Sequence, residues 1–357
     1  MFNLFSAGEN APSTLTWPAS VSLMQRRWRL QWVNVTPKIG KFVEFKRFSK
    51  KFERDDFMKV AVIQMSPVFL DKTATWEKLK LMILEAIQEG ASVVTWSETL
   101  IPGYPVWMGM TDAARWNNPD QKRVYSTYAR ESVSLNGKIV SEMCEISSEH
   151  GVMLMGGILE GSGSSVYATL LTIGFDGQIL GRHRKIKPTF DERLLWADGD
   201  TEGLKTYDTP EGPIGGLNCW ENWIPLARAA LHQDGEMIHL AVWPGSHSLT
   251  KDITKFMALE GRSWILSACG VYRGEDFGHL SLEDFPLRDE MLEAGGLHSG
   301  GSLIAAPTGE IIAGPLPDYE EGILYAEVDK RTVLEERQNF DYSGHYSRPE
   351  LLNLKRD

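Results

Sequence analysis

The chain has 357 residues, of which 42% are hydrophobic, and a formal net charge of −11 at pH 7. This length supports one large domain or two smaller ones, the acidic balance argues against nucleic acid as a partner, and no apolar run is long enough to span a bilayer. The three cysteines, Cys144, Cys219 and Cys269, match no zinc or CxxC spacing, and such sparse use is typical of a reducing cytoplasm. We therefore expect a cytoplasmic globular protein.

Residues 1–57 differ from the rest of the chain in charge and pattern. They carry ten basic and five acidic residues, a net +5, which leaves −16 for the remainder. The segment shows no sustained hydrophobic period, so it is a transit peptide, a partner-binding arm, or the result of a start assigned upstream of a true first residue at Met58. We favour the third interpretation and expect the segment to be poorly ordered and dispensable for activity.

The folded part is predicted to begin with a β-α-β unit. Buried strands are expected at 60–64 and 91–96, and the apolar side chains of 76–87 recur at helical spacing between them. Asp71 and Thr73 can cap this helix. Such a unit normally forms a parallel strand pair with a right-handed crossover.

Glu98 follows the second predicted strand and begins a loop rich in proline and glycine. Open α/β sheets bind their ligands at the carboxyl ends of strands, so this position predicts a site residue. The ordinary alternative is a solvated loop glutamate, against which its aromatic and proline neighbours argue.

The middle of the chain combines a second helical stretch with a hairpin. Residues 121–150 show helical periodicity. The Asp-Gly pair at 176–177 joins two apolar runs, which is a strong hairpin signal. Parallel and antiparallel pairs together predict a mixed sheet, with strands expected at 152–159, 166–173 and 178–184.

A basic run follows in residues 182–193. It suits a solvated patch or a phosphate site, but no glycine-rich loop accompanies it, so we discount phosphate. The remaining interpretation is that one lysine points into a pocket as a fixed cation. Lys185 is in phase with one face of the preceding strand, but the pattern alone does not choose between Lys185 and Lys187.

Cys219 lies between a strand expected at 213–218 and a helix expected at about 222–234. A thiol at a strand-to-helix turn lies near the positive end of a helix dipole, which lowers its pKa and favours a nucleophile. The ordinary alternative is a small buried core residue.

The rest of the chain continues to alternate strands and helices, with residues 273–299 expected to be an irregular insertion. This order fits a two-sheet α/β sandwich with helices outside, in one domain from 58 to 330, and we expect the tail 331–357 to pack at a subunit interface. The remaining strands are expected at 237–243, 264–272, 300–306, 310–313 and 322–328, with helices at 254–263 and from Lys330.

Three motifs and a C-terminal segment occur in a distinctive order along the chain. They are Ser-Glu98-Thr-Leu-Ile-Pro-Gly-Tyr-Pro, His-Arg-Lys185-Ile-Lys-Pro-Thr, Cys219-Trp-Glu-Asn-Trp-Ile-Pro and Gly344-His-Tyr-Ser-Arg-Pro. From about residue 59 to 352 the chain resembles the nitrilase branch of the carbon–nitrogen hydrolase superfamily.

The resemblance implies an α-β-β-α sandwich with a catalytic triad of Glu98, Lys185 and Cys219, and it selects Lys185 over Lys187. It also implies that Glu192 lies near the triad and helps to position it. Subunits of this family pair and often assemble into larger oligomers or filaments. The implied chemistry needs no metal or organic cofactor.

The expected reaction converts a small-molecule nitrile to a carboxylic acid and ammonia. Cys219 attacks the nitrile carbon to form a thioimidate, Glu98 transfers protons and activates water, and Lys185 stabilises developing negative charge. The backbone N–H of Trp220 can add a donor, and Glu221 and Asn222 are expected to support the thiol.

Three alternatives remain at this point: an amidase or carbamoyl hydrolase with the same triad, release of the amide by a hydratase route, and a non-catalytic scaffold whose filament is its function. The aromatic residues near the motifs are compatible with aryl, arylacetyl and aliphatic nitriles alike.

Overall fold

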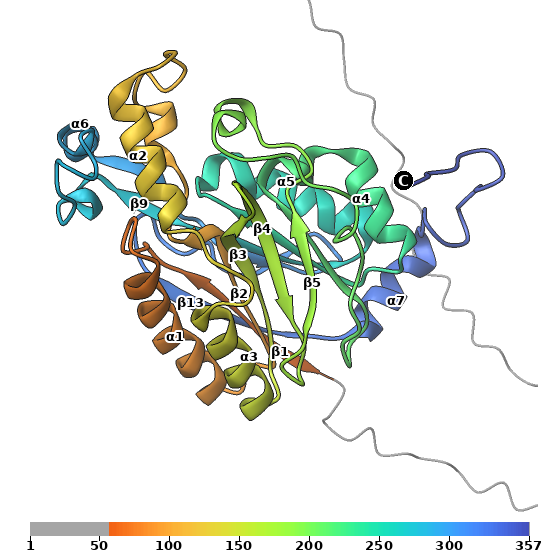
Figure 1. Cartoon of the computed structure of the whole chain (residues 1–357). Helices are drawn as coiled ribbons and strands as arrows, with labels where there is room; N and C mark the ends of the chain where they lie inside the picture. Colours follow the sequence, from red (N-terminus) through yellow and green to blue (C-terminus); the bar gives the residue numbers. More distant parts are fainter. Residues whose placement is uncertain (1–56, 357) are drawn as a thin grey trace, which may run out of the picture. The chain divides into compact units, whose positions relative to one another are not determined.

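The computed structural model describes residues 57–356 (Figure 1). The expectation for segment 1–57 therefore lies, except for Phe57, outside the described residues. Within them the strands form two larger sheets and one small ribbon. The first sheet has the order β13-β1-β2-β3-β4-β5, built from β1 (Met58–Gln64), β2 (Val93–Ile101), β3 (Met153–Ser162), β4 (Ser165–Ile173), β5 (Ile179–Arg184) and β13 (Gly322–Val328).

The second sheet has the order β12-β11-β8-β7-β6. Its strands are β6 (Ile214–Asn218), β7 (Ile238–Trp243), β8 (Trp264–Cys269), β11 (Leu303–Ala305) and β12 (Ile311–Ala313), and the ribbon pairs β9 (Val271–Arg273) with β10 (Gly296–Ser299). Strands β1, β2 and β3 of the first sheet are parallel, as are β6, β7 and β8 of the second, and the remaining neighbours in both sheets pair antiparallel. The prediction of a mixed sheet is confirmed.

The helices cover the two outer faces (Figure 1). On the first sheet lie α1 (Lys72–Gln88) and α3 (Lys138–His150), and on the second lie α4 (Pro225–Gln233) and α5 (His247–Gly261). Side chains of both sheets, such as Val62 and Leu240, form one buried cluster between them. The apolar face of each strand or helix is thereby removed from water, and the layer order is the predicted α-β-β-α sandwich.

The first helix shows how local sequence sets an element. The Asp71 side chain accepts a hydrogen bond from the Ala74 N–H at the helix start, while Thr73 lies inside the helix and does not cap it. Trp76 and Leu79 are among the residues that turn its apolar face onto the first sheet. Gly90, with a φ of +86°, follows its end.

Several predicted boundaries were wrong. The stretch 121–150 is two helices, α2 (Pro119–Arg130) and α3, because Val133 leaves the helix to bridge Glu160 of β3. The segment 273–299 is not irregular, since it contains η4 (Gly274–Phe277), α6 (Arg288–Ala294) and β10. The strand expected at 264–272 divides into β8 and β9. Helix α5 begins at His247, well before the predicted residue 254, whereas β13 has the predicted ends. The ends of α4 and of most remaining strands differ from the predictions by a few residues. The last helix, α7 (Lys330–Asn339), begins at the residue predicted.

Strand β2 is longer than predicted, with a consequence for the site. It continues to Ile101, so Glu98 lies within a strand and not in the loop after it. Its pairing with β3 is irregular between Trp96 and Ile101, and Thr99 has a φ of +42°. Such a bulge redirects side chains that would otherwise alternate regularly. Among residues 57–356, no helix combines the length and apolar character needed to cross a membrane.

Candidate active site

Cys219 begins η3 (Cys219–Trp223), a short 3-10 turn that directly follows the buried strand β6. Its φ is +49°, a left-handed conformation that a non-glycine residue rarely adopts. Strained backbone of this kind is concentrated at functional sites. The thiol is buried, at 4% relative exposure of the residue.

Lys185 follows the end of β5 and is buried, whereas Lys187 is exposed and pairs with Asp198 at 2.7 Å. The Lys185 Nζ donates to Glu98 Oε1 at 2.9 Å and to Glu192 Oε2 at 2.7 Å. The structure thus places Lys185, and not Lys187, between the two predicted carboxylates. Burial alone would lower the pKa of Lys185. The neighbouring carboxylates outweigh this effect and raise the pKa above its usual range, so the ammonium stays charged.

Glu98 is fully buried, and its two oxygens have different surroundings. Oε1 accepts from Lys185, while Oε2 has no hydrogen-bond partner within residues 57–356. Burial raises the pKa of Glu98 to about 8, although the charge of Lys185 acts in the opposite direction. A carboxyl group with a pKa near neutrality and a free oxygen is suited to accept and return a proton.

Glu192 is held by three donors and is fixed more firmly than Glu98. It lies in η2 (Phe190–Leu194) and accepts from Lys185, from the Thr189 N–H at 2.5 Å and from the Tyr104 hydroxyl at 2.7 Å. Because its oxygens are already engaged, Glu192 is less free than Glu98 to exchange a proton, and its bond to Lys185 restrains the ammonium.

Tyr104 and Trp196 complete the wall around the charged groups, and sequence reasoning missed both. The Tyr104 and Trp196 rings make a T-shaped contact, with their centres 5.7 Å apart. The Lys185 Nζ lies 5.4 Å from the centre of the Trp196 ring. The position of Tyr104 in the Pro-Gly-Tyr-Pro run after Glu98 was the available signal. No local pattern marked Trp196.

The electrostatics of the Cys219 thiol contradict the expectation of a lowered pKa. Burial raises its pKa well above the usual value, and the charge of Lys185 and the Trp220 N–H offset only part of that effect. Helix α4 begins only at Pro225, after η3, so its N-terminus does not lie at the sulfur. Desolvation therefore outweighs the local positive charges.

Glu221 connects the cysteine turn to the lysine strand. Its Oε2 accepts from the Asn218 N–H at 2.9 Å and contacts the His183 Nε2 at 3.0 Å, and its Oε1 accepts from the Ile186 N–H at 2.6 Å. One buried carboxylate thus fixes the residues beside both Lys185 and Cys219. His183 was not recognised from the sequence as part of this link.

Asn222 is also buried beside the thiol, and its side-chain Nδ2 donates to the Cys219 carbonyl at 2.9 Å. Trp220 contributes differently, because about half of its surface is exposed. Only its backbone N–H faces the sulfur.

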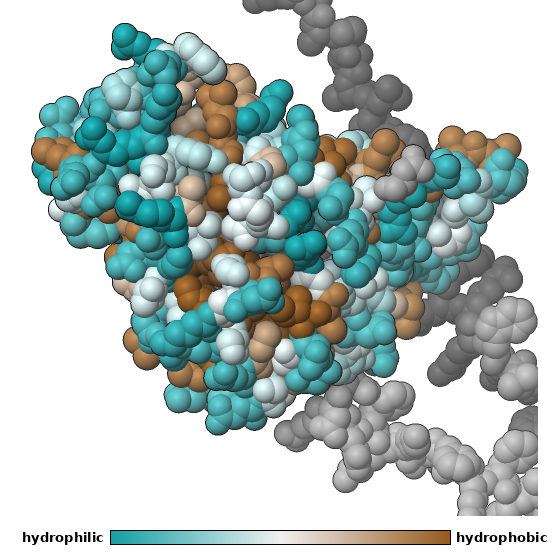
Figure 2. All heavy atoms as spheres, viewed as in Figure 1, coloured by the Kyte–Doolittle hydropathy of each residue, from teal (hydrophilic) through white to brown (hydrophobic). Residues whose placement is uncertain are grey.

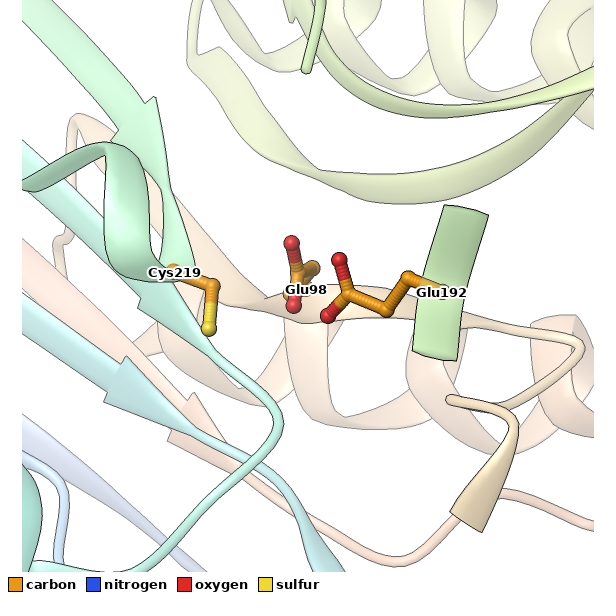
Figure 3. A group of neighbouring side chains, drawn as sticks. All are labelled: Glu98, Glu192 and Cys219. Atoms are coloured by element: carbon orange, nitrogen blue, oxygen red, sulfur yellow. The ribbon is translucent and has the colours of Figure 1, made fainter. Parts of the chain in front are cut away.

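Figure 3 shows Glu98 between Glu192 and Cys219, with the two carboxylates facing each other. One ligand-type atom from each of these residues lies within 4.8 Å of the others, a spacing compatible with a metal ion. The Lys185 ammonium already bonds both carboxylates, so a cation would have to displace it. The arrangement suits a thiol served by a proton-transferring carboxyl and a fixed ammonium.

The α-β-β-α sandwich thus brings a buried cysteine, a lysine and two glutamates together. Residues 59–338 match the carbon–nitrogen hydrolase model, and the chain belongs to this family. An aliphatic nitrilase from Rhodococcus rhodochrous is 32% identical over 85% of this chain and 83% of its own length. A bifunctional nitrilase/nitrile hydratase from Nicotiana tabacum is 33% identical over 83% of this chain and 85% of its own.

These relatives place the chain in the nitrilase branch of the family. A solved carbon–nitrogen hydrolase from Helicobacter pylori G27 superimposes with a TM-score of 0.63 over 84% of this chain and 99% of that one. Its sequence identity is 18%, so this likeness concerns the fold.

Proposed function

We propose that this protein is a nitrilase that converts an organic nitrile to a carboxylic acid and ammonia through covalent intermediates on Cys219. The observation that carries the proposal is the Lys185 ammonium bonded to Glu98 and Glu192 beside a buried thiol. The similarity to named nitrilases over most of the chain supports the nitrile as substrate.

In the first half of the reaction, Cys219 attacks the nitrile carbon as its thiol proton passes to Glu98. The proton then goes to the nitrile nitrogen, which gives a thioimidate. Because the pKa of the thiol is raised, attack and proton transfer are expected to be coupled, without a standing thiolate.

In the second half, Glu98 removes a proton from water as the water adds to the thioimidate. Glu98 passes that proton to the nitrogen, and as the tetrahedral species collapses the hydroxyl proton moves to the departing amine, so that the carbon–nitrogen bond breaks, ammonia leaves and a thioester remains. A second water hydrolyses the thioester to the acid and restores the thiol. Lys185 is placed to stabilise the negative charge of each tetrahedral species, and the Trp220 N–H adds a donor near the sulfur.

An amidase with the same residues is the second candidate, and early release of the amide is a variant of the first. The tobacco relative is named for both nitrilase and nitrile hydratase, which favours measuring both products. A purely structural protein would have no need to retain a buried lysine between two carboxylates.

The test measures products with purified wild-type protein and Cys219→Ala. Each is incubated with aryl, arylacetyl and aliphatic nitriles and with the corresponding amides, and acid, amide and ammonia are quantified. We expect acid and ammonia from nitriles with the wild type and none with the variant, because the nucleophile is absent. Turnover of amides alone would identify an amidase and overturn the proposal.

We further propose that the subunits associate through an apolar surface on α4 and the C-terminal tail, here called the α4–tail surface. It is formed by Leu226, Ala229, Tyr346, Leu351 and Leu352 around a groove of about 740 Å³. Leu226, Tyr346 and both tail leucines are exposed. Figure 2 shows apolar residues on the tail at the upper right. Apolar patches of this kind commonly mark protein interfaces.

A further inference from the structure

The Asn222 side chain bonds the backbone on both sides of the end of β6, the strand that leads to Cys219. Its Nδ2 donates to the Leu217 carbonyl at 3.1 Å and to the Cys219 carbonyl at 2.9 Å. The Cys219 carbonyl and the Trp220 N–H belong to one planar peptide unit, so a bond that orients the carbonyl also orients the N–H. That N–H is a backbone donor that acts to lower the pKa of the Cys219 thiol, against the larger effect of burial.

The other end of the Asn222 amide is held by His239. Both hydrogens of Nδ2 are used, so Oδ1 is the acceptor, and the His239 Nε2 donates to it at 2.7 Å. The His239 Nδ1 lies 2.8 Å from Glu236 Oε1, and with Nε2 as a donor this second contact is a hydrogen bond when Nδ1 or the Glu236 carboxyl group also carries a proton. All three side chains are buried, with 1% exposure or less.

The position of His239 follows from the sheet. It lies in β7, which is parallel to β6, and its register partner is Gly215. Its hydrogen bond to Asn222 reaches the cysteine turn from this neighbouring strand. None of the hydrogen bonds described for residues 57–356 joins His239 to Glu98, Lys185 or Glu192.

We propose that His239, oriented by Glu236, is a positioning residue for the nucleophile. It acts through Asn222 on the Cys219–Trp220 peptide plane and so keeps the Trp220 N–H directed at the sulfur. The inference rests on Cys219 being the nucleophile of the proposed function. Without the His239 donor, Asn222 Oδ1 is buried without a partner, and the amide has reason to rotate away from the Cys219 carbonyl.

The test measures thiol reactivity directly, with iodoacetamide as the probe and mass spectrometry of the Cys219 peptide as the readout. This separates Cys219 from Cys144 and Cys269, and it requires no nitrile. His239→Leu is expected to slow alkylation of Cys219 by about tenfold, because the N–H near the sulfur is no longer fixed. His239→Gln, whose amide can again donate to Asn222, is expected to restore most of the rate.

His232→Leu is the matched control. His232 is also buried and lies 3.5 Å from Glu236, but it has no hydrogen bond to Asn222. We expect this variant to alkylate within about twofold of the wild-type rate. With a substrate in hand, His239→Leu should lower kcat and leave KM nearly unchanged, since the residue does not touch the substrate.

Equal slowing in His239→Leu and His232→Leu, or no recovery in His239→Gln, would overturn the proposal. If His239→Leu does not fold, the comparison of His239→Gln with the shorter His239→Asn replaces it, and equal rates in that pair would count against the proposal. Nitrile hydrolysis that persists in Cys219→Ala would instead refute the proposed function, so the two failures are distinguishable.

Discussion

Lys185→Met removes the buried ammonium of the site with little change in side-chain volume. The substitution tests how much this charge contributes to the stability of the fold. In the wild type, Lys185 bonds two carboxylates that are themselves 2% exposed or less. Removing one partner from a buried charge network typically costs about 3–5 kcal/mol of unfolding free energy. The carboxylates of Glu98 and Glu192 lie within 4.8 Å of each other, and at an effective dielectric constant of about 20 their repulsion is roughly 3 kcal/mol or more.

The pKa of Glu98 determines how the destabilisation by Lys185→Met changes with pH. The pKa of Glu98 is about 8 in the fold and near 4.5 ordinarily, so the folded protein binds a proton that the unfolded chain has released. Stability from this group is therefore lost as pH rises toward 8, at up to about 1.4 kcal/mol per pH unit, and then levels off. Without Lys185, which lowers this pKa, the loss continues above pH 8.

The assay is urea unfolding at pH 8 and pH 9.5, with Lys187→Met as the matched control. Lys187 is two residues away, exposed and paired with Asp198, so its loss is expected to cost less than about 1 kcal/mol at either pH. The destabilisation by Lys185→Met should grow by roughly 1–2 kcal/mol between the two pH values. Equal destabilisation by the two substitutions, or no growth with pH, would refute the reasoning.

Two further predictions concern the link behind the thiol and the subunit contact. Glu221→Gln replaces one acceptor oxygen with an N–H₂ group that faces a backbone donor, so we expect about 1–3 kcal/mol lower stability and at least tenfold slower turnover; unchanged turnover would contradict the role assigned to Glu221. Leu226→Lys places a charge in the α4–tail surface and should reduce the oligomer size measured by analytical ultracentrifugation, whereas Leu81→Lys, at an exposed leucine on α1, should not. Equal effects of the two leucine substitutions would count against this interface.

The sequence determined the architecture because hydrophobic periodicity and turn chemistry act locally. The helix beginning after Asp71 and the Asp176-Gly177 hairpin were predicted from neighbouring residues and occur in the fold. The two sheets and their helical layers follow from that order of elements. The family resemblance carried by the motifs also identified the residues that the fold brings together. Glu98 and Cys219 were singled out by their own runs, whereas the resemblance selected Lys185 over Lys187 and added Glu192.

The tertiary structure decided what depends on burial and on distant partners. The dipole argument predicted a lowered pKa for Cys219, but desolvation within the sandwich raises it. A helix terminus can be recognised from neighbouring residues, whereas the loss of water around a side chain depends on every element packed against it. The raised pKa of Glu98 has the same origin.

Tyr104 and His239 were not identified from the sequence for a related reason. Tyr104 bonds Glu192 across 88 positions, and His239 reaches Asn222 from a neighbouring strand. A buried histidine or tyrosine has no local signature that distinguishes a positioning role from ordinary core packing. The sequence therefore indicated the candidate site residues. The fold determined their burial and the partners that hold them in place, because those depend on contacts between residues far apart in the chain.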